Sequence, residues 1–141
     1  MGYKYQRLDK DNAVVLLVDH QAGLSSLVRD IDPDKFKNNT LALAALAKYF
    51  NLPTILTTSF EDGPNGPLWT EIKDMNPDAP YIARPGQVNA WDNEDFVNAV
   101  KATGKKQIII AGIVTEVCVE FPTLSALEEG FEVFVVSDAS G

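Results

Sequence analysis

Three side chains of different chemistry lie where strands of this sequence are expected to end. Asp19 closes the apolar run AVVLLVD, Arg84 closes the short segment YIAR, and Cys118 follows the run QIIIAGI. In an open parallel α/β sheet, ligands bind outside the carboxyl ends of the strands. The sequence therefore predicts that an acid, a cation and a thiol meet at one edge of a sheet.

Cys118 is the candidate nucleophile. The reactive form of cysteine is the thiolate, and a free thiol has a pKa of about 8.5. A helix N-terminus and a nearby cation both stabilise this anion, and backbone N–H groups at such a turn can receive an oxyanion. The alternative is a small buried hydrophobic residue, because its neighbours Val117 and Val119 are apolar.

The other polar candidates also have structural alternatives. Asp19 is expected either to deprotonate or orient a neighbouring group, or to cap a buried strand where it meets water. Arg84 serves a site only if it faces these partners, and is otherwise a surface ion-pair residue. His20 is the only histidine. It supports neither a Ser/His/Asp triad nor a multi-histidine metal site, and we interpret it as loop structure.

Strands and helices alternate along the chain, and these elements must position the three groups. Continuous β-branched and leucine runs are typical of strands buried on both faces. Pro122 lies inside the last expected helix, so this helix should kink or begin only near Phe121. The expected strands are 13–19, 53–58, 81–84, 107–113 and 131–138; the expected helices are 33–50, 68–75, 93–103 and 116–129.

This order predicts an α/β fold with right-handed crossovers: a three-layer α/β/α, Rossmann-like parallel sheet. Asp32 with Pro33 at the first helical position is a helix-start signal, as is Asp92 or Asn93 further on. No linker or repeat divides the chain, so we expect one domain over residues 1–141. Because the sequence stops directly after a buried-type strand, we expect the natural protein to continue with further C-terminal elements.

Composition excludes several classes of partner. The net charge is −8 with a pI of about 4.5, which disfavours nucleic acid and anionic membranes. No apolar run approaches the roughly 20 residues that cross a bilayer, and residues 1–10 lack the apolar core of a signal peptide. A single cysteine permits no internal disulfide and fits a reducing compartment. We therefore expect a cytoplasmic protein.

Four stretches resemble the isochorismatase-like hydrolase superfamily and, within it, the YcaC branch of cysteine hydrolases. They are VVLLVDHQAGL at 14–24, TTSFEDGPNGPL at 57–68, ARPGQVNAWDNEDF at 83–96 and IIAGIVTEVCV at 109–119. The resemblance covers essentially the whole chain. Its most specific part is the pattern Gly-x-x-Thr-Glu-x-Cys, paired with an aspartate at the end of the first strand.

The resemblance implies a catalytic triad of aspartate, lysine and cysteine. Asp19 and Cys118 match two of its positions, and Arg84 stands where most members carry lysine. It further implies a non-proline cis peptide at Ile113–Val114, and an oxyanion hole formed by the N–H groups of Val114 and Cys118. His20, Phe60, Trp91 and Thr115 are the candidate pocket residues; together with Trp69, the aromatic ones are equally compatible with core or interface.

The implied reaction is hydrolysis of an amide-type C–N bond in a small molecule through a thioester. The family's metal-binding members use histidines that this chain lacks near 57–70, so we expect no metal and no other cofactor. Relatives assemble as rings, so we expect a homo-oligomer, with an octamer as the candidate assembly.

Three alternatives are weighed against this function. A catalytically silent oligomeric scaffold of the same fold is favoured by Arg84, since arginine is a poor proton shuttle. An ether hydrolase like isochorismatase itself is disfavoured by the presence of Cys118. A phospho-receiver domain is disfavoured because Thr58 and Gly112 occupy the strand ends where such a domain needs acidic residues.

Overall fold

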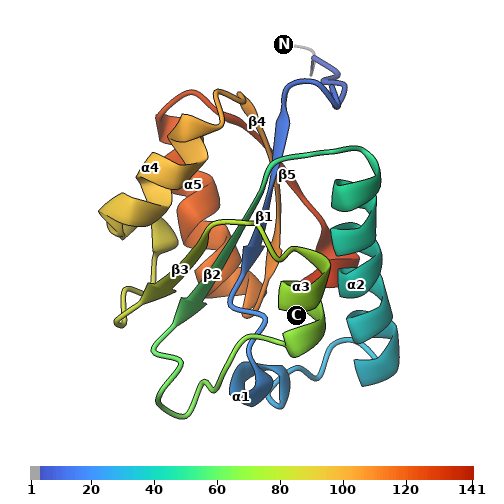
Figure 1. Cartoon of the computed structure of the whole chain (residues 1–141), viewed down its shortest axis with the longest axis vertical. Helices are drawn as coiled ribbons and strands as arrows, with labels where there is room; N and C mark the ends of the chain where they lie inside the picture. The colour runs from blue at the N-terminus through green and yellow to red at the C-terminus, as the bar shows by residue number, and fades with distance from the viewer. Residues whose placement is uncertain (1–3) are drawn as a thin grey trace.

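A five-stranded parallel sheet runs through the centre of the molecule (Figure 1). The computed structural model describes residues 4–141, so the first three residues of the segment 1–10 lie outside the described part. The strand order is β3-β2-β1-β4-β5, which confirms the predicted parallel α/β sheet. The strands are β1 (Ala13–Val18), β2 (Thr54–Ser59), β3 (Tyr81–Arg84), β4 (Gln107–Gly112) and β5 (Glu132–Val135).

Helices cover both faces of the sheet, which gives the expected three layers. α4 and α5 pack on one face and α2 and α3 on the other (Figure 1). The short α1 follows β1 directly. The helices are α1 (Ala22–Ser25), α2 (Pro33–Tyr49), α3 (Thr70–Met75), α4 (Glu94–Ala102) and α5 (Glu120–Glu128).

Two apolar cores explain why β1 reads as an unbroken hydrophobic run. This strand lies between β2 and β4, and all six of its residues are buried. Leu16 belongs to the core under α4 and α5, whereas its neighbour Leu17 belongs to the core under α2 and α3. Because side chains alternate between the two faces, a central strand of a covered sheet needs apolar residues at every position.

Capping residues place the ends of the long helices where the sequence predicts. The Asp32 carboxylate accepts a hydrogen bond of 3.0 Å from the Lys35 N–H at the start of α2, and Asn93 caps α4 in the same way. Leu46 of α2 and Phe50, directly after this helix, are 52% and 46% exposed, so they do not belong to its buried face.

The segment that joins β4 to α5 does not have regular α-helical geometry. Residues 115–119 form a single π-helical turn, and α5 begins at Glu120. The N–H of Val119 bonds to the carbonyl of Val114, five residues back, at 3.3 Å. Pro122 has no N–H to give to the carbonyl of Cys118, so regular α-helical bonding cannot run through this turn. The helix therefore begins late, close to the second of the two predicted possibilities.

Candidate active site

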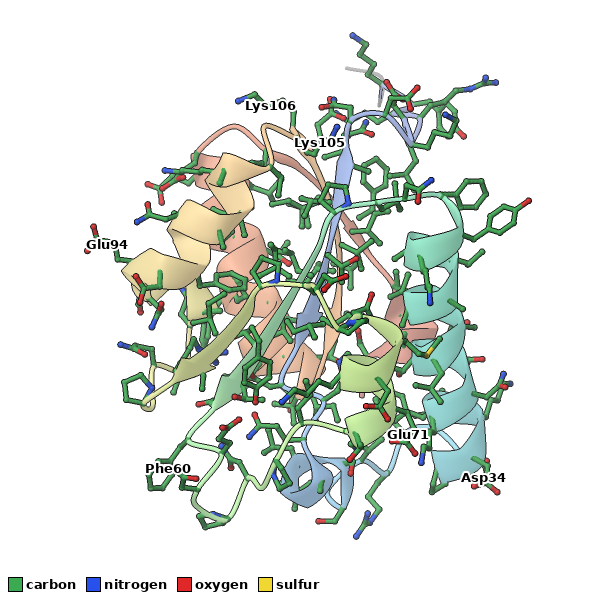
Figure 2. The ribbon with its side chains drawn as sticks, in the orientation of Figure 1. Asp34, Phe60, Glu71, Glu94, Lys105 and Lys106 are labelled. Atoms are coloured by element: carbon green, nitrogen blue, oxygen red, sulfur yellow. The ribbon has the colours of Figure 1, made fainter. Side chains whose placement is uncertain are left out.

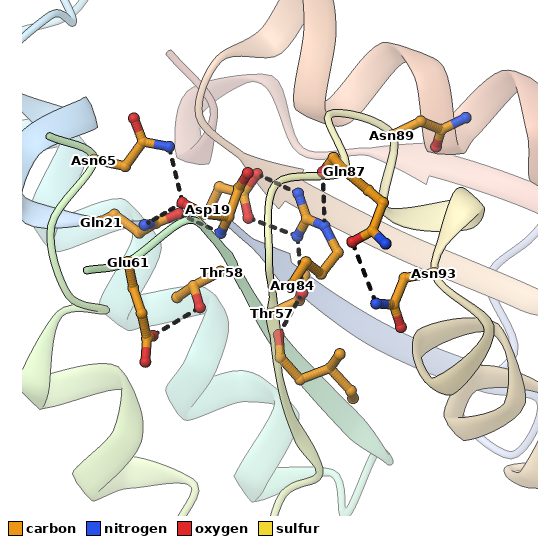
Figure 3. A network of polar contacts seen from close by, with 12 residues as sticks. Asp19, Gln21, Thr57, Thr58, Glu61, Asn65, Arg84, Gln87, Asn89 and Asn93 are labelled. Carbon is orange, nitrogen blue, oxygen red and sulfur yellow. Dashed lines mark hydrogen bonds and ion pairs between the residues drawn. The ribbon is translucent and has the colours of Figure 1, made fainter. Parts of the chain in front are cut away.

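A buried ion pair joins the ends of β1 and β3. The Arg84 guanidinium holds both carboxylate oxygens of Asp19, with Nη1–Oδ1 at 2.8 Å and Nη2–Oδ2 at 2.9 Å (Figure 3). Neither side chain is exposed. Arg84 also donates from Nη1 to the hydroxyl of Thr57, at 2.8 Å, and from Nε to the carbonyl of Gln87, at 3.0 Å. Arg84 is therefore an interior residue, not a surface ion-pair partner.

The backbone turns sharply at Asp19. Its φ of 59° lies in the left-handed region, which aspartate tolerates better than most residues. The Asp19 N–H still bonds to the carbonyl of Thr57 in β2, at 3.0 Å. The carboxylate is thus presented at the carboxyl end of the sheet while the main chain stays attached to it.

Cys118 lies beside this pair at the switch point of the sheet. The chain builds outward from β1 through β2 to β3 and then returns to place β4 on the other side of β1. In such sheets the crevice between the two diverging strands is the usual ligand site. Asp19 follows β1, and half-buried Cys118 follows β4 in the π-helical turn. The three predicted catalytic residues are therefore brought together.

The environment of Cys118 favours the neutral thiol. Burial raises the pKa of the thiol to about 12, and so do the charge of Asp19 and a hydrogen bond to its carboxylate; a backbone hydrogen bond from Val114 and the charge of Arg84 act in the opposite direction. The sequence led us to expect a stabilised thiolate, and this expectation is wrong for the structure as it stands. The main reason is burial of the thiol, and the opposing attraction of Arg84 does not offset it because Arg84 is paired with Asp19.

The backbone before Cys118 has the unusual geometry that the resemblance implies. The Ile113–Val114 peptide is cis. A backbone hydrogen bond from Val114 lowers the pKa of the Cys118 thiol, so the backbone of one of the two residues predicted for an oxyanion hole lies next to this candidate nucleophile. The other residue is Cys118 itself.

His20 takes the structural role that the sequence favoured. It is fully buried, and its Nε2 donates to the carbonyl of Ala139 at 3.0 Å. Its ring lies beside those of Phe36 and Trp69, at centroid distances of 6.0 and 5.5 Å. Burial lowers the pKa of His20 to about 4, against the opposing effect of the bond to Ala139. The neutral ring therefore belongs to the packing between α2 and α3.

The remaining pocket candidates are scattered. Trp91 packs edge-on against Phe96 and Phe131 in the core under α4 and α5. Phe60 is 53% exposed and points away from the sheet (Figure 2). Thr115 is half-buried at the start of the turn that carries Cys118. Of these candidates, Thr115 alone lies in the same π-helical turn as Cys118, the candidate nucleophile.

Several polar residues that the sequence analysis did not single out fix the surrounding loops. The Gln21 amide accepts from the N–H of Ser59 at 2.8 Å and donates to the carbonyls of Ser59 and Gly66 at 3.0 and 2.7 Å. Glu61 accepts from the hydroxyls of Thr58 and Tyr81. The loop after β2 is therefore tied to the ends of β1 and β3. The sequence signal that could have identified Gln21 is its place two positions after Asp19, the residue that closes the first apolar run.

Within residues 4–141, no cluster of three or more histidine, cysteine, aspartate or glutamate side chains is arranged to hold a metal ion. The same part of the chain contains no helix long and apolar enough to cross a membrane.

The sequence is similar to known proteins over nearly its whole length. Residues 13–141 match the isochorismatase domain family. A protein of Escherichia coli strain K12, named "Probable hydrolase YcaC", is 80% identical over 141 residues, which is 100% of this chain and 68% of that protein.

Two solved structures of YcaC proteins superpose closely on this fold. The Pseudomonas aeruginosa protein, with hexane-2,5-diol and covalent acrylamide, has a TM-score of 0.97 at 77% identity and is covered over 69% of its chain. The Escherichia coli protein, described as an octameric hydrolase of unknown specificity, has a TM-score of 0.97 at 78% identity and the same coverage. Each match includes 99% of the present chain.

The buried pair makes a testable contribution to stability. Arg84→Met leaves the Asp19 carboxylate uncompensated in the interior, so the free energy of unfolding should fall by about 3–5 kcal/mol at neutral pH. The double variant Asp19→Leu/Arg84→Met should recover much of this loss, because no lone charge remains. Urea denaturation measures both. As a control, Lys37→Met breaks the half-exposed Lys37–Glu71 pair and should have little effect; equal losses in both single variants would contradict the assignment.

The raised pKa of Cys118 also predicts a pH response. Asp19→Asn removes the negative charge and the carboxylate acceptor that raise this pKa, so the thiol should ionise at lower pH. The rate of Cys118 alkylation by iodoacetamide, followed by mass spectrometry from pH 6 to 11, should therefore rise at lower pH in the variant than in the wild type. An unchanged profile would mean that Asp19 does not control the thiol.

Proposed function

This chain belongs to the isochorismatase family and is a hydrolase of that family, and from that premise we propose that Cys118 is the nucleophile that cleaves an amide-type C–N bond of a small molecule. The observation that carries the proposal is the contact of the Cys118 thiol with a carboxylate, Asp19, that is itself held by Arg84. A buried acceptor next to a protonated nucleophile is the arrangement that general-base catalysis requires.

Asp19 is the proposed base. Because the thiol is neutral at physiological pH, the proton must leave as the sulfur attacks, and the Asp19 carboxylate, which acts on the thiol through its charge and a hydrogen bond, is the proposed acceptor. Arg84 stays charged at any working pH. It therefore serves as a fixed clamp that orients both oxygens of Asp19, and proton transfer is assigned to Asp19 alone.

The reaction begins when the sulfur forms a bond to the amide carbon as the thiol proton moves to Asp19. The carbonyl oxygen becomes an oxyanion, which the N–H groups of Val114 and Cys118 receive. The C–N bond then breaks, and Asp19 returns the proton to the departing nitrogen. Water attacks the resulting thioester with Asp19 again as base, releasing the acid and restoring the thiol.

A relative lends chemical support. Acrylamide is an electrophile, and the Pseudomonas aeruginosa protein at 77% identity is described with acrylamide bound covalently. Formation of such a bond requires a reactive nucleophile in that relative. A half-buried thiol at the switch point of the sheet is the group we assign to that role in the present chain.

A silent scaffold of the same fold is the competing function. It is favoured by Arg84, since arginine is a poor proton shuttle, and by the raised pKa of Cys118, since an un-ionised thiol is a weak nucleophile. The two functions differ in whether Asp19 can take up the proton during attack. We further infer that the chain acts as one isochorismatase domain, and that it works in the cytoplasm, where the single cysteine stays reduced.

The nucleophile assignment is tested with p-nitrophenyl acetate, whose acyl group a thiolate can accept without a specific substrate. The wild type should release p-nitrophenolate and gain an acetyl group on Cys118, detected by mass spectrometry, and Cys118→Ala should do neither. The wild type is then screened against small amides. Acylation or amide hydrolysis retained in the alanine variant would overturn the assignment, and an inert wild type would favour the scaffold.

Assembly is a separate prediction. The Escherichia coli relative at 78% identity is an octamer. Because the two sequences are so similar, we propose that this chain also forms a homo-oligomer. Light scattering coupled to size exclusion should give a multiple of the 15.4 kDa chain mass, with eight copies as the expected state. A monomeric mass across the concentration range would contradict it.

A further inference from the structure

The last connection between β4 and β5 is not a direct backbone-to-backbone hydrogen bond. Ile110 pairs with Val135, and the N–H of Val136 donates to the carbonyl of Ile110 at 2.9 Å. In a parallel ladder the next bond would run from the Gly112 N–H to the Val136 carbonyl. The Ser140 hydroxyl lies between these two groups instead: it accepts from the Gly112 N–H at 3.2 Å and donates to the Val136 carbonyl at 2.9 Å.

Gly141, the residue after Ser140, also bonds to the segment that follows β4. The N–H of Gly141 donates to the Gly112 carbonyl at 3.2 Å, and the Gly141 carbonyl accepts from the Thr115 N–H at 3.0 Å. Together with the bond between Ser140 and Gly112, these bonds hold the loop on both sides of the Ile113–Val114 peptide. From the opposite side, the Ile113 N–H donates to the carbonyl of Val18 in β1 at 3.1 Å. The loop that leads to Cys118 is therefore held from both neighbouring segments.

The segment 137–141, which we call the strap, is itself anchored independently of Ser140. Its Ala139 carbonyl accepts from Nε2 of His20 at 3.0 Å, and its Asp138 carbonyl accepts from the Asn39 amide of α2 at 3.1 Å. Ala139 is fully buried against that helix. Loss of the Ser140 hydroxyl should thus leave the strap in place and loosen chiefly the Gly112 end of the loop.

We propose that Ser140 is a positioning residue for the oxyanion hole. The inference rests on the proposed function, because it gives Ser140 the task of fixing the backbone that carries the Val114 N–H, two residues from Gly112. Oxyanion donors contribute to catalysis only when they are held in place before charge develops on the substrate. Ser140 is 2% exposed and acts through Gly112, so it need not touch the substrate.

Two probes separate this role from a general effect on Cys118. p-Nitrophenyl acetate reacts through an oxyanion: the sulfur bonds to the carbonyl carbon, the thiol proton passes to Asp19, and p-nitrophenolate leaves. Iodoacetamide reacts at a saturated carbon: the sulfur–carbon bond forms as iodide leaves, the thiol proton passes to Asp19, and no oxyanion develops. The ratio of the two rate constants at Cys118 therefore reports on the oxyanion hole alone.

The comparison uses the wild type, Ser140→Ala and Ser140→Thr, with Cys118→Ala as the background. In Ser140→Ala the acylation rate should fall by about tenfold or more, since removal of one oxyanion donor outright costs about a hundredfold or more, while alkylation changes less than about twofold. Ser140→Thr keeps a hydroxyl and should restore most of the ratio. An unchanged ratio in Ser140→Ala, or equal loss of both reactions, overturns the inference.

The outcomes distinguish the inference from the function beneath it. If the wild type shows no acylation that depends on Cys118, the proposed function fails and the inference with it; if the wild type is acylated and the ratio ignores Ser140, the inference alone fails. A second measurement needs no variant. The Gly112 N–H should exchange with deuterated water as slowly as that of Ile110 within β4, and fast exchange would overturn the proposed bond to Ser140.

Discussion

The fork of hydrogen bonds between Arg84 and Asp19 is the interaction on which the site depends. Two charges are removed from water, which is costly unless each is matched by geometry and further hydrogen bonds. Here both carboxylate oxygens are engaged, and two further guanidinium N–H groups donate to the Thr57 hydroxyl and the Gln87 carbonyl. The pair also spans β2, joining the ends of the two strands on either side of it. The same pair therefore sets both the charge balance and the geometry of the strand ends, and the charge of Asp19 adds to burial in raising the pKa of the Cys118 thiol.

The second half of the site depends on the main chain. A close approach of strands at Gly112, where a Cβ atom would lie 2.2 Å from the Val18 carbonyl oxygen, leaves no room for a side chain. The loop from Gly112 to Cys118 is then shaped by backbone bonds to β1 and to the strap. This division has a physical logic: side-chain charges set where the proton can go, and fixed peptide dipoles set where negative charge can settle.

Much of this could be predicted from the sequence, because the information is local. The strand ends that carry Asp19 and Cys118 follow from apolar runs, and the late start of α5 follows from Pro122. Thr57 and Ser140 could not be predicted, since their partners depend on strand register and on where β5 leaves the sheet. The raised pKa of the thiol was missed for a similar reason: burial, its largest cause, and the pairing of Arg84 with Asp19 both depend on the tertiary structure. The sequence around an aromatic residue such as Trp91 does not show whether its side chain lies in the core or in a pocket.

The neutral state of the Cys118 thiol has a consequence for the lifetime of the protein. Peroxides oxidise thiolates, and the sulfenic, sulfinic and sulfonic acids that form successively begin with that anion. A cysteine whose proton is held by burial and by a neighbouring carboxylate presents little anion to an oxidant. The environment of Cys118 should therefore slow its oxidation by peroxide relative to an exposed cysteine that ionises freely.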